Sequence, residues 1–260
     1  MHPLAEKYLR KSALPTMFCP GCGNGIILNA MVRVADKIGA DGFSYVSGIG
    51  CSSWLPVMIK ADVLHTLHGR AVAAATGLKL AQPGRRVVVF TGDGDCLGIG
   101  GNHLIHAARR NIDLTVIMIN NHIYGMTGGQ ASPTTPLKAV TKTTPYGSDE
   151  PPFDACTLTT AAGASFTARE TSSHPRRLAK TLERAILHTG FSFLEVMTPC
   201  PVQAGRNIYG NGDPVFLFKE FAARAVNNPD ESSVSGCFRT GILHCESGKP
   251  AYSDSKSKMS

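Results

Sequence analysis

The sequence lacks the features that mark several common classes of protein. No stretch approaches 18 uninterrupted apolar residues, so a membrane-spanning helix is not predicted. The N-terminal residues show neither the apolar core nor the small-residue cleavage site of a secretory signal, and we expect a cytoplasmic protein. No arginine-rich tract and no basic patch with interleaved aromatic residues is present, so nucleic-acid binding is not predicted either.

What is present suffices for a large folded unit. The chain has 260 residues, of which 43% are apolar, enough to bury one substantial core. The formal net charge of +7 could steer phosphorylated ligands toward the protein, although ordinary surface lysines and arginines account for it equally well. In a reducing compartment, the eight cysteines indicate thiols or metal ligands rather than disulfides.

Short apolar runs rich in β-branched residues alternate with segments of helical spacing. This alternation predicts an α/β fold with a mostly parallel sheet and helices on both faces. A stretch with five prolines, residues 130–152, is predicted to be a functional lid or disordered. We expect a main domain, residues 1–221, and a polar tail, residues 222–260, that packs weakly or elsewhere and contacts another subunit. The expected strands are 43–47, 86–91, 114–120, 164–168 and 191–197, and the expected helices are 25–38, 69–81, 101–109, 154–162 and 175–188.

The most informative stretch is TGDGDCLGIGG, followed after a helix and a strand by NN. Asp93 and Asn121 each follow a predicted strand, and neighbouring strands of a parallel sheet end at the same edge. A carboxylate, an amide oxygen and a backbone carbonyl suit Mg²⁺, a cation that proteins commonly share with phosphates. Gly92 and Gly94 would let the backbone approach a diphosphate, and the helix that opens near Gly100 could offer its amides to it.

Two other interpretations apply to this stretch. A dinucleotide-binding fingerprint needs a third glycine, but Leu97 stands at that position and the match fails. The other is a glycine-rich turn between a strand and a helix, with no ligand.

The CPGCG stretch, which contains Cys19 and Cys22, could be a redox dithiol, part of a metal site or a tight turn. A thioredoxin-type dithiol would carry Gly-Pro between its cysteines and follow a strand, whereas a zinc ribbon would need a second Cys-x-x-Cys. Cys51 and Cys200 each follow a predicted strand, and four thiolates are the usual ligands of a [4Fe–4S] cluster. Spacing alone supports that set only weakly. The other cysteines are interpreted as buried or incidental thiols: Cys96, Cys156, Cys237 and Cys245.

Taken in order, the motifs CPGCG, GIGCSSW, HGRA, GDGD…NN, IYGMTGGQASPTTP and TPC resemble the β subunit of the 2-oxoacid:ferredoxin oxidoreductases. The resemblance extends from Phe18 to Gly205. It implies the thiamine-diphosphate-binding (diphosphate-domain) fold, with thiamine diphosphate, Mg²⁺ and a [4Fe–4S] cluster as cofactors. The implied reaction is oxidative decarboxylation of a 2-oxoacid with coenzyme A, yielding an acyl-CoA, CO₂ and reduced ferredoxin. The loop motif is slightly closer to the 2-oxoglutarate-type members.

The resemblance also implies roles for individual residues. The Mg²⁺ ligands would be Asp93, Asn121 and the carbonyl of Ile123, and His68 and Thr127 would lie at the catalytic centre. The diphosphate contacts fall on Gly94, Asp95, Gly125 and Met126. The cofactor would lie against Ile49, Gly50, Cys51 and Ser52, with His68 beside it. The cluster ligands would be Cys19, Cys22, Cys51 and Cys200.

The resemblance implies partners as well. An α subunit would supply the glutamate that activates the pyrimidine ring, because none of the eight glutamates of this chain lies in a recognisable pyrimidine-binding motif. Further small ferredoxin-like subunits, ferredoxin and coenzyme A complete the expected assembly. Some family members carry a lysine where Gly128 stands, so a role of that lysine in substrate binding cannot be transferred to this chain. Two alternatives remain: a non-oxidative thiamine-diphosphate decarboxylase or synthase subunit with a structural metal, and an iron–sulfur electron-transfer subunit without thiamine.

Overall fold

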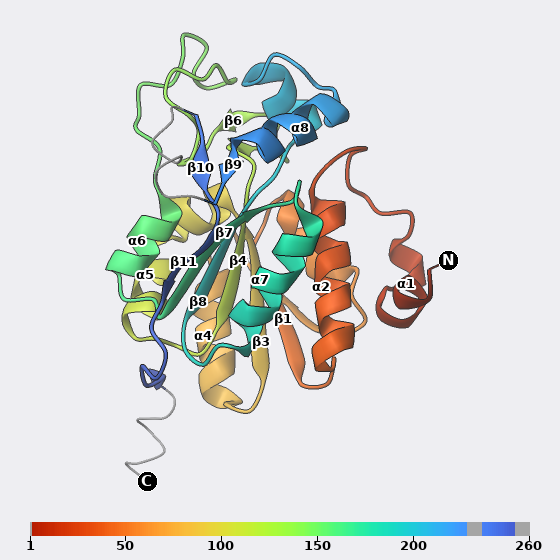
Figure 1. Ribbon diagram of the computed structural model, residues 1–260, viewed down its shortest axis with the longest axis vertical. Helices are drawn as coiled ribbons and strands as arrows, with labels where there is room; N and C mark the ends of the chain where they lie inside the picture. Colours follow the sequence, from red (N-terminus) through yellow and green to blue (C-terminus); the bar gives the residue numbers. More distant parts are fainter. Residues whose placement is uncertain (1, 228–235, 253–260) are drawn as a thin grey trace.

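The computed structural model describes residues 2–227 and 236–252 of the chain. A seven-stranded sheet in the order β11-β7-β8-β4-β3-β1-β2 forms its centre (Figure 1). All neighbouring strands pair in parallel except β11, which runs antiparallel to β7 at the edge. The sheet strands are β1 (Phe43–Ser47), β2 (Asp62–His65), β3 (Arg86–Gly92), β4 (Thr115–Asn120), β7 (Phe166–Thr171), β8 (Ser192–Met197) and β11 (Gly241–Cys245).

Helices cover both faces of this sheet, which confirms the predicted fold class. Short strand pairs lie outside it: β5 (Ile123–Tyr124) with β6 (Gln130–Ala131), and β9 (Ala225–Val226) with β10 (Phe238–Arg239). The α-helices are α1 (Pro3–Tyr8), α2 (Asn24–Ile38), α3 (Trp54–Val57), α4 (Ala71–Ala81), α5 (Gly101–Arg109), α6 (Ala155–Ala161), α7 (Pro175–Leu187) and α8 (Pro214–Arg224).

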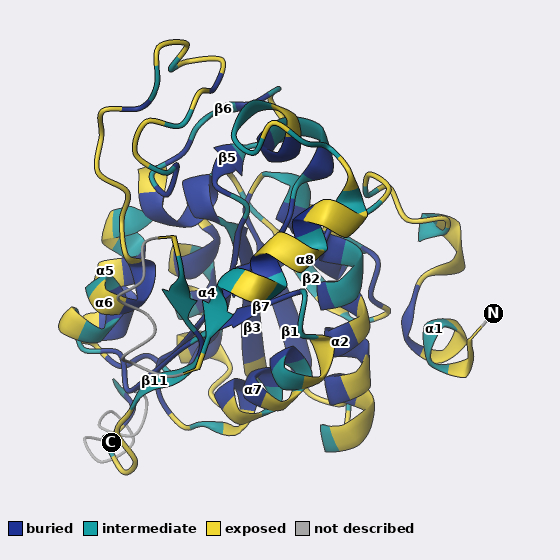
Figure 2. Cartoon of the chain, turned by 45° about the horizontal axis from the view of Figure 1, so that its top comes forward, coloured by how far each residue is buried: buried dark blue, intermediate teal, exposed yellow. Residues whose placement is uncertain are grey.

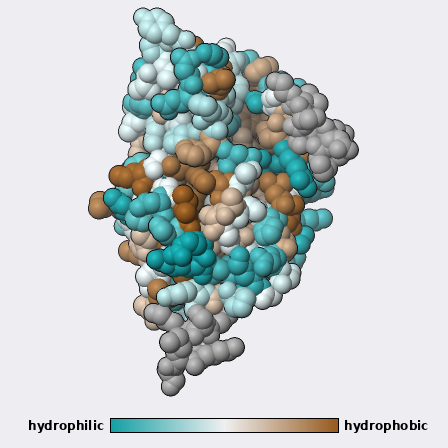
Figure 3. Space-filling view, turned by 90° about the vertical axis from the view of Figure 1, so that its left-hand side faces the viewer, coloured by the Kyte–Doolittle hydropathy of each residue, from teal (hydrophilic) through white to brown (hydrophobic). Residues whose placement is uncertain are grey.

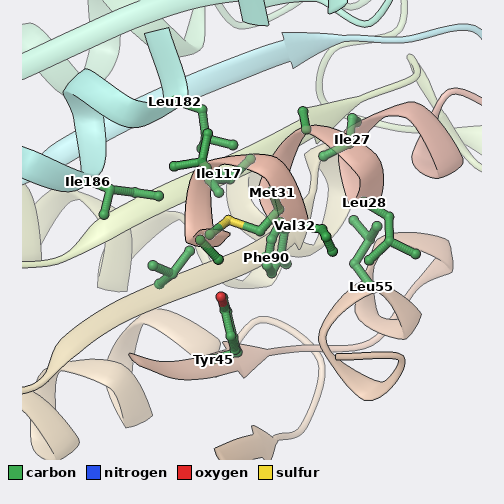
Figure 4. Close-up of a cluster of buried hydrophobic side chains, with 14 of the residues drawn as sticks. Ile27, Leu28, Met31, Val32, Tyr45, Leu55, Phe90, Ile117, Leu182 and Ile186 are labelled. Carbon is green, nitrogen blue, oxygen red and sulfur yellow. The ribbon is translucent and has the colours of Figure 1, made fainter. Parts of the chain in front are cut away.

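Two apolar clusters fill the space between the sheet and its helices. The first lies under α2 and α7, where Met31 and Leu182 meet Phe90 and Ile117 of the strands (Figure 4). The second lies on the opposite face, under α4, α5 and α6. Figure 2 shows the buried strands between partly exposed helices. Because a parallel sheet is covered on both faces, its strands read as nearly continuous apolar runs, and this made them predictable.

The ends of most expected helices and strands lie within two residues of the observed ends. The main exception is β7. That strand was expected at residues 164–168 but continues to Thr171, because Arg169 and Glu170 find polar partners inside the protein. The sequence did not reveal β2, a short and mostly exposed edge strand, or β11.

The tail beyond Phe221 differs from its prediction. The expectation that it packs weakly is wrong for part of it, because β11 extends the main sheet and Ala251 is buried. Its role in subunit contact stays a prediction. The polar stretches 228–235 and 253–260 lie outside the described residues.

The proline-rich segment 130–152 forms the long loop at the top of Figure 1, and its residues Ser132, Thr134 and Thr135 are buried. Backbone hydrogen bonds close it on itself: Lys138 N donates to Ser148 O at 2.6 Å, and Ser148 N donates to Ala139 O at 2.9 Å. In the described part of the chain, no helix is long and apolar enough to cross a membrane.

Candidate cofactor and metal site

The carboxyl ends of β1, β3 and β4 open into one small cavity of about 90 Å³. This is the edge of the sheet at which ligands bind in open α/β folds. Most of the residues predicted for cofactor and Mg²⁺ binding line it together. They are Ile49, Gly50, Cys51, Ser52, His68, Asp93, Gly94, Asp95, Asn121, Ile123, Gly125, Met126 and Thr127.

Asp93 is the most informative side chain in this cavity. It is buried, and its Oδ2 accepts hydrogen bonds from Ser132 Oγ at 2.6 Å and Thr134 Oγ1 at 2.7 Å. Among the described residues no basic side chain pairs with it, and burial raises its pKa to about 6. A buried carboxylate without a countercharge is costly. The site therefore fits a cation, and Asp93, Asn121 and the carbonyl of Ile123 offer the oxygen donors that Mg²⁺ prefers.

The second aspartate of the GDGD stretch, Asp95, has a different role. Its Oδ1 accepts from the backbone N–H of Gly69 at 2.7 Å and of Ile49 at 3.2 Å, and its Oδ2 accepts from Thr91 Oγ1 at 2.7 Å. His68 Nδ1 lies 3.0 Å from Oδ1. The carboxylate thus fixes the segments that carry Ile49 and His68. Because both carboxylate oxygens are occupied, only the backbone of Asp95 remains available to contact a diphosphate. That contact stays a prediction.

Gly94 meets a requirement that the sequence did not indicate. A Cβ atom on Gly94 would lie 2.1 Å from Cε1 of Tyr124, whose hydroxyl donates to Gly94 O at 3.2 Å. The glycine therefore lets an aromatic ring close the turn, in addition to the predicted close approach of a diphosphate.

The four cysteines predicted to bind a cluster come from three separate segments of the chain and gather beside the cavity. Burial, with smaller contributions from the thiols of Cys200, Cys51 and Cys19, raises the pKa of Cys22 to about 12. A Cβ on Gly125 would lie 3.5 Å from Cys51 Sγ and 3.8 Å from Cys200 Sγ. All four are free thiols. Within the described ranges, no three His, Cys, Asp or Glu side chains converge on a point that would hold a single metal ion.

A four-iron cluster is bulkier than one ion, so its ligands surround a volume instead of meeting at a point. The gathered thiols suit that arrangement, and thiolate is the ligand of such clusters. The other cysteines lie elsewhere: Cys96 and Cys156 are buried in the second apolar cluster, Cys237 is half-buried and Cys245 is exposed.

The proline-rich loop, residues 130–152, brings a lysine to the rim of the cavity. Lys142 N donates to Gly129 O at 3.0 Å, and Lys142 Nζ lies 3.0 Å from the position that a Cβ on Gly128 would occupy. Beside them, Thr127 Oγ1 donates to Gln130 Oε1 at 2.6 Å. Sequence reasoning missed Lys142 because the two stretches lie apart in the chain and only the folded loop brings them together.

Sequence reasoning also missed the hydroxyls that hold Asp93. Ser132 and Thr134 belong to the SPTTP motif, which was used as a family signature without a role for its hydroxyls. Thr135 Oγ1 donates to His122 O at 2.7 Å, so the same motif fastens the loop to the end of β4. The three hydroxyl residues of this proline-containing motif, Ser132, Thr134 and Thr135, were the feature of the sequence that could have indicated these hydrogen bonds.

The fold and the cavity are those expected of a thiamine-diphosphate-binding protein, and a family model shows that the chain is a member of this class. The family model described as "Thiamine pyrophosphate enzyme, C-terminal TPP binding domain" matches residues 48–196, more than half of the chain.

Named relatives narrow the class. A 2-oxoglutarate synthase subunit KorB from Methanothermobacter marburgensis is 57% identical over 223 residues, covering 85% of this chain and 78% of that protein. A 2-oxoglutarate oxidoreductase subunit KorB from Mycobacterium tuberculosis is 46% identical over 211 residues, which cover 80% of this chain and 55% of that protein. The chain belongs to this family of 2-oxoacid oxidoreductase β subunits, as its motifs predicted.

A solved structure agrees with this assignment. The 2-oxoglutarate:ferredoxin oxidoreductase from Magnetococcus marinus, with 2-oxoglutarate, coenzyme A and succinyl-CoA bound, superposes with a TM-score of 0.88 at 32% identity. The match covers 98% of this chain and 89% of that chain.

Proposed function

We propose that this chain is the β subunit of a 2-oxoglutarate:ferredoxin oxidoreductase. The complex would convert 2-oxoglutarate and coenzyme A to succinyl-CoA and CO₂, and both electrons would pass to ferredoxin. The observation that carries the proposal is the convergence of the Asp93 cavity and the four gathered thiols at one edge of the sheet. A diphosphate-binding site beside a cluster site is what an oxidative thiamine enzyme requires.

When bound, thiamine diphosphate would supply the nucleophilic carbon that attacks the 2-oxo carbon. Asp93, Asn121 and the carbonyl of Ile123 would hold Mg²⁺, and the backbone amides at the start of the π-helix Gly94–Ile99 would bind the diphosphate. Asp95 would keep Ile49 and His68 against the cofactor through the hydrogen bonds described above.

Cys51 would connect the two parts of the site. It lines the cofactor cavity and belongs to the gathered thiols, together with Cys19, Cys22 and Cys200. A [4Fe–4S] cluster on these four residues would lie next to the cofactor. It could therefore accept electrons from the oxidised substrate one at a time.

The lysine at the rim supports a dicarboxylate substrate. Lys142 is exposed, and its ammonium group has no hydrogen-bond or ion-pair partner among the described residues. It lies beside Gly128 and Thr127, where the distal end of a bound 2-oxoacid would emerge from the cavity. A free cation there suits the second carboxylate of 2-oxoglutarate, a group that pyruvate lacks.

The site also needs a partner. About 90 Å³ is far below the roughly 300–1,000 Å³ of typical cofactor sites, and none of the glutamates in the described part of the chain lines the cavity. Two large apolar side chains that line it, Ile49 and Met126, are exposed. Further apolar side chains gather near the middle of the face that carries α5 and α6 (Figure 3). An α subunit would complete the cavity and supply the glutamate that activates the pyrimidine ring.

The proposal is tested by anaerobic ferredoxin reduction with coenzyme A, using the chain alone and the complex with its α subunit. We expect turnover of 2-oxoglutarate only by the complex. Turnover by the chain alone, with the partner shown absent by mass spectrometry, would contradict the partner assignment. A complex that turns over no 2-oxoacid would contradict the proposed function.

The substrate assignment is tested in the same assay with Lys142→Met. Losing a charged contact costs roughly 1.5–3 kcal/mol, so the ratio of kcat/KM for 2-oxoglutarate to that for pyruvate should fall about tenfold or more. Lys138→Met is the matched control, because Lys138 lies in the same loop but pairs with Asp149. An unchanged ratio in Lys142→Met would remove Lys142 from substrate recognition.

A further inference from the structure

A chain of buried polar side chains runs from Asp93 back into the sheet. The Thr134 hydroxyl lies 2.7 Å from Asp93 Oδ2 and 2.9 Å from Asn120 Oδ1. Asn120 Nδ2 in turn donates to Glu195 Oε1 at 2.7 Å. All four residues are buried. The candidate metal site is therefore connected to a carboxylate that does not line its cavity.

Arg169 flanks Glu195 from the other side. Arg169 Nε donates to Glu195 Oε2 at 2.6 Å, and Arg169 also pairs with Asp154 at 2.7 Å. Cys156 Sγ lies 3.5 Å from Glu195 Oε2. A buried ion pair is a poor source of stability, because desolvation offsets its Coulomb energy. This arrangement therefore calls for a role other than holding the fold together.

The hydrogen-bond chemistry supplies that role. An ionised carboxylate only accepts, so Glu195 requires the Asn120 amide to turn its NH₂ group toward it. The Asn120 carbonyl then faces the Thr134 hydroxyl, and it also accepts from His122 N at 3.0 Å. The Thr134 hydroxyl has one proton and two acceptors, Asp93 and Asn120. The orientation of Asn120 thus decides whether Asp93 has a competitor for that proton.

We infer that Glu195 is a positioning residue for the metal site. By fixing the Asn120 amide, it keeps a second acceptor on the Thr134 hydroxyl, so the Thr134 proton is shared between Asn120 and Asp93. The shared hydrogen bond withdraws less charge from Asp93 Oδ2, which leaves that oxygen a stronger ligand for the cation. In a flipped Asn120 the NH₂ group would face Thr134, and the hydroxyl would donate to Asp93 alone. The inference rests on the proposed function, since it assumes that Asp93 binds Mg²⁺.

Glu195→Gln tests this with little change in shape. Glutamine offers one acceptor where Glu195 uses two, so its NH₂ group must face either Arg169 or Asn120. If the glutamine NH₂ group faces Arg169, two donor groups point at each other, which is unfavourable. If it faces Asn120, it favours the flipped orientation of the Asn120 amide. Partners behind metal ligands typically contribute 10- to 100-fold to metal affinity, so we expect the Kd for the metal to rise by about that factor.

Glu170→Gln is the matched control. Glu170 is as buried as Glu195 and lies on the neighbouring strand, but on the opposite face of the sheet, where it accepts from Thr181 Oγ1 at 2.8 Å. The readout is the Kd of Mn²⁺, measured by EPR on the complex with thiamine diphosphate. A role confined to folding would lower the Tm of both variants and leave this Kd unchanged.

The expected result is a Kd raised about 10- to 100-fold in Glu195→Gln and unchanged within twofold in Glu170→Gln. If Glu195→Gln does not fold, Asn120→Ala, which leaves the Arg169 pair intact, should show the same rise. A Kd within twofold of the parent in the folded variant would overturn the inference while leaving the proposed function intact. A parent complex that binds no Mn²⁺ would overturn both.

Discussion

The two faces of the central sheet differ in what they bury. Under α2 and α7, the central strands β4 and β8 contribute apolar side chains up to their carboxyl ends, Ile119 and Val196, and the buried Glu170 of the neighbouring β7 is bonded to Thr181. On the face that carries α6, β8 places Glu195 between Leu194 and Val196, next to Arg169 of β7. Alternate residues of one strand thus serve packing on one side and a buried polar chain on the other.

We interpret this contrast as a division of roles, in which the apolar side chains stabilise the fold and the buried polar side chains serve the candidate site. An apolar face lowers the free energy of the folded state through burial, whereas buried charges cost free energy unless something compensates them. The uncompensated carboxylate of Asp93 and the Glu195 chain behind it both lie near the candidate cofactor cavity. A protein keeps such a local disadvantage where a ligand offsets it. The contrast can be tested by exchanging single residues on each side.

The largest effect is expected from Asp93→Asn. The variant should lose Mg²⁺-dependent binding of thiamine diphosphate, because the amide carries no charge for the cation. Without Mg²⁺, its Tm should equal or exceed that of the parent, because a buried charge without a partner has been removed. Calorimetric titration and thermal unfolding measure the two results. Binding as tight as in the parent would remove Asp93 from the metal site.

The next effect concerns iron. Cys200→Ala should lose most of the iron bound to this chain in the anaerobically purified complex with the α subunit, because one of four cluster ligands is gone. Cys156→Ala should keep it, since Cys156 lies in the apolar cluster under α6. Iron analysis of both variants checks this. Equal iron content would exclude Cys200 from the ligand set.

The smallest effect on the site is expected from the apolar face. Leu182 of α7 is fully buried in the first cluster, so Leu182→Ala should lower the free energy of unfolding by about 2–5 kcal/mol. The Mn²⁺ affinity of the folded variant should match that of the parent. A parallel loss of affinity would show that the two faces do not divide these roles.

The sequence predicted the sheet and the strand-end residues well, for a physical reason. Buried parallel strands read as apolar runs, and their carboxyl ends must share one edge, so Asp93 and Asn121 were expected to meet. It did not predict the chain behind Asp93, because Thr134, Asn120 and Glu195 are far apart in sequence. Glu195 appeared only as a glutamate outside any pyrimidine-binding motif, although a charge inside the apolar run FLEVM was a signal. Likewise, Lys142 reaches the rim only through the folded loop.

The central claim is that this chain holds a thiamine diphosphate–Mg²⁺ site next to an iron–sulfur cluster. The most direct test is the cofactor content of the complex with its α subunit, purified without oxygen. We expect thiamine diphosphate and Mg²⁺ together with about four irons and as many sulfides bound to this chain, and loss of that iron in Cys200→Ala. Zinc with thiamine diphosphate, or iron without thiamine diphosphate, would contradict the account and favour a non-oxidative enzyme or an electron-transfer subunit, respectively.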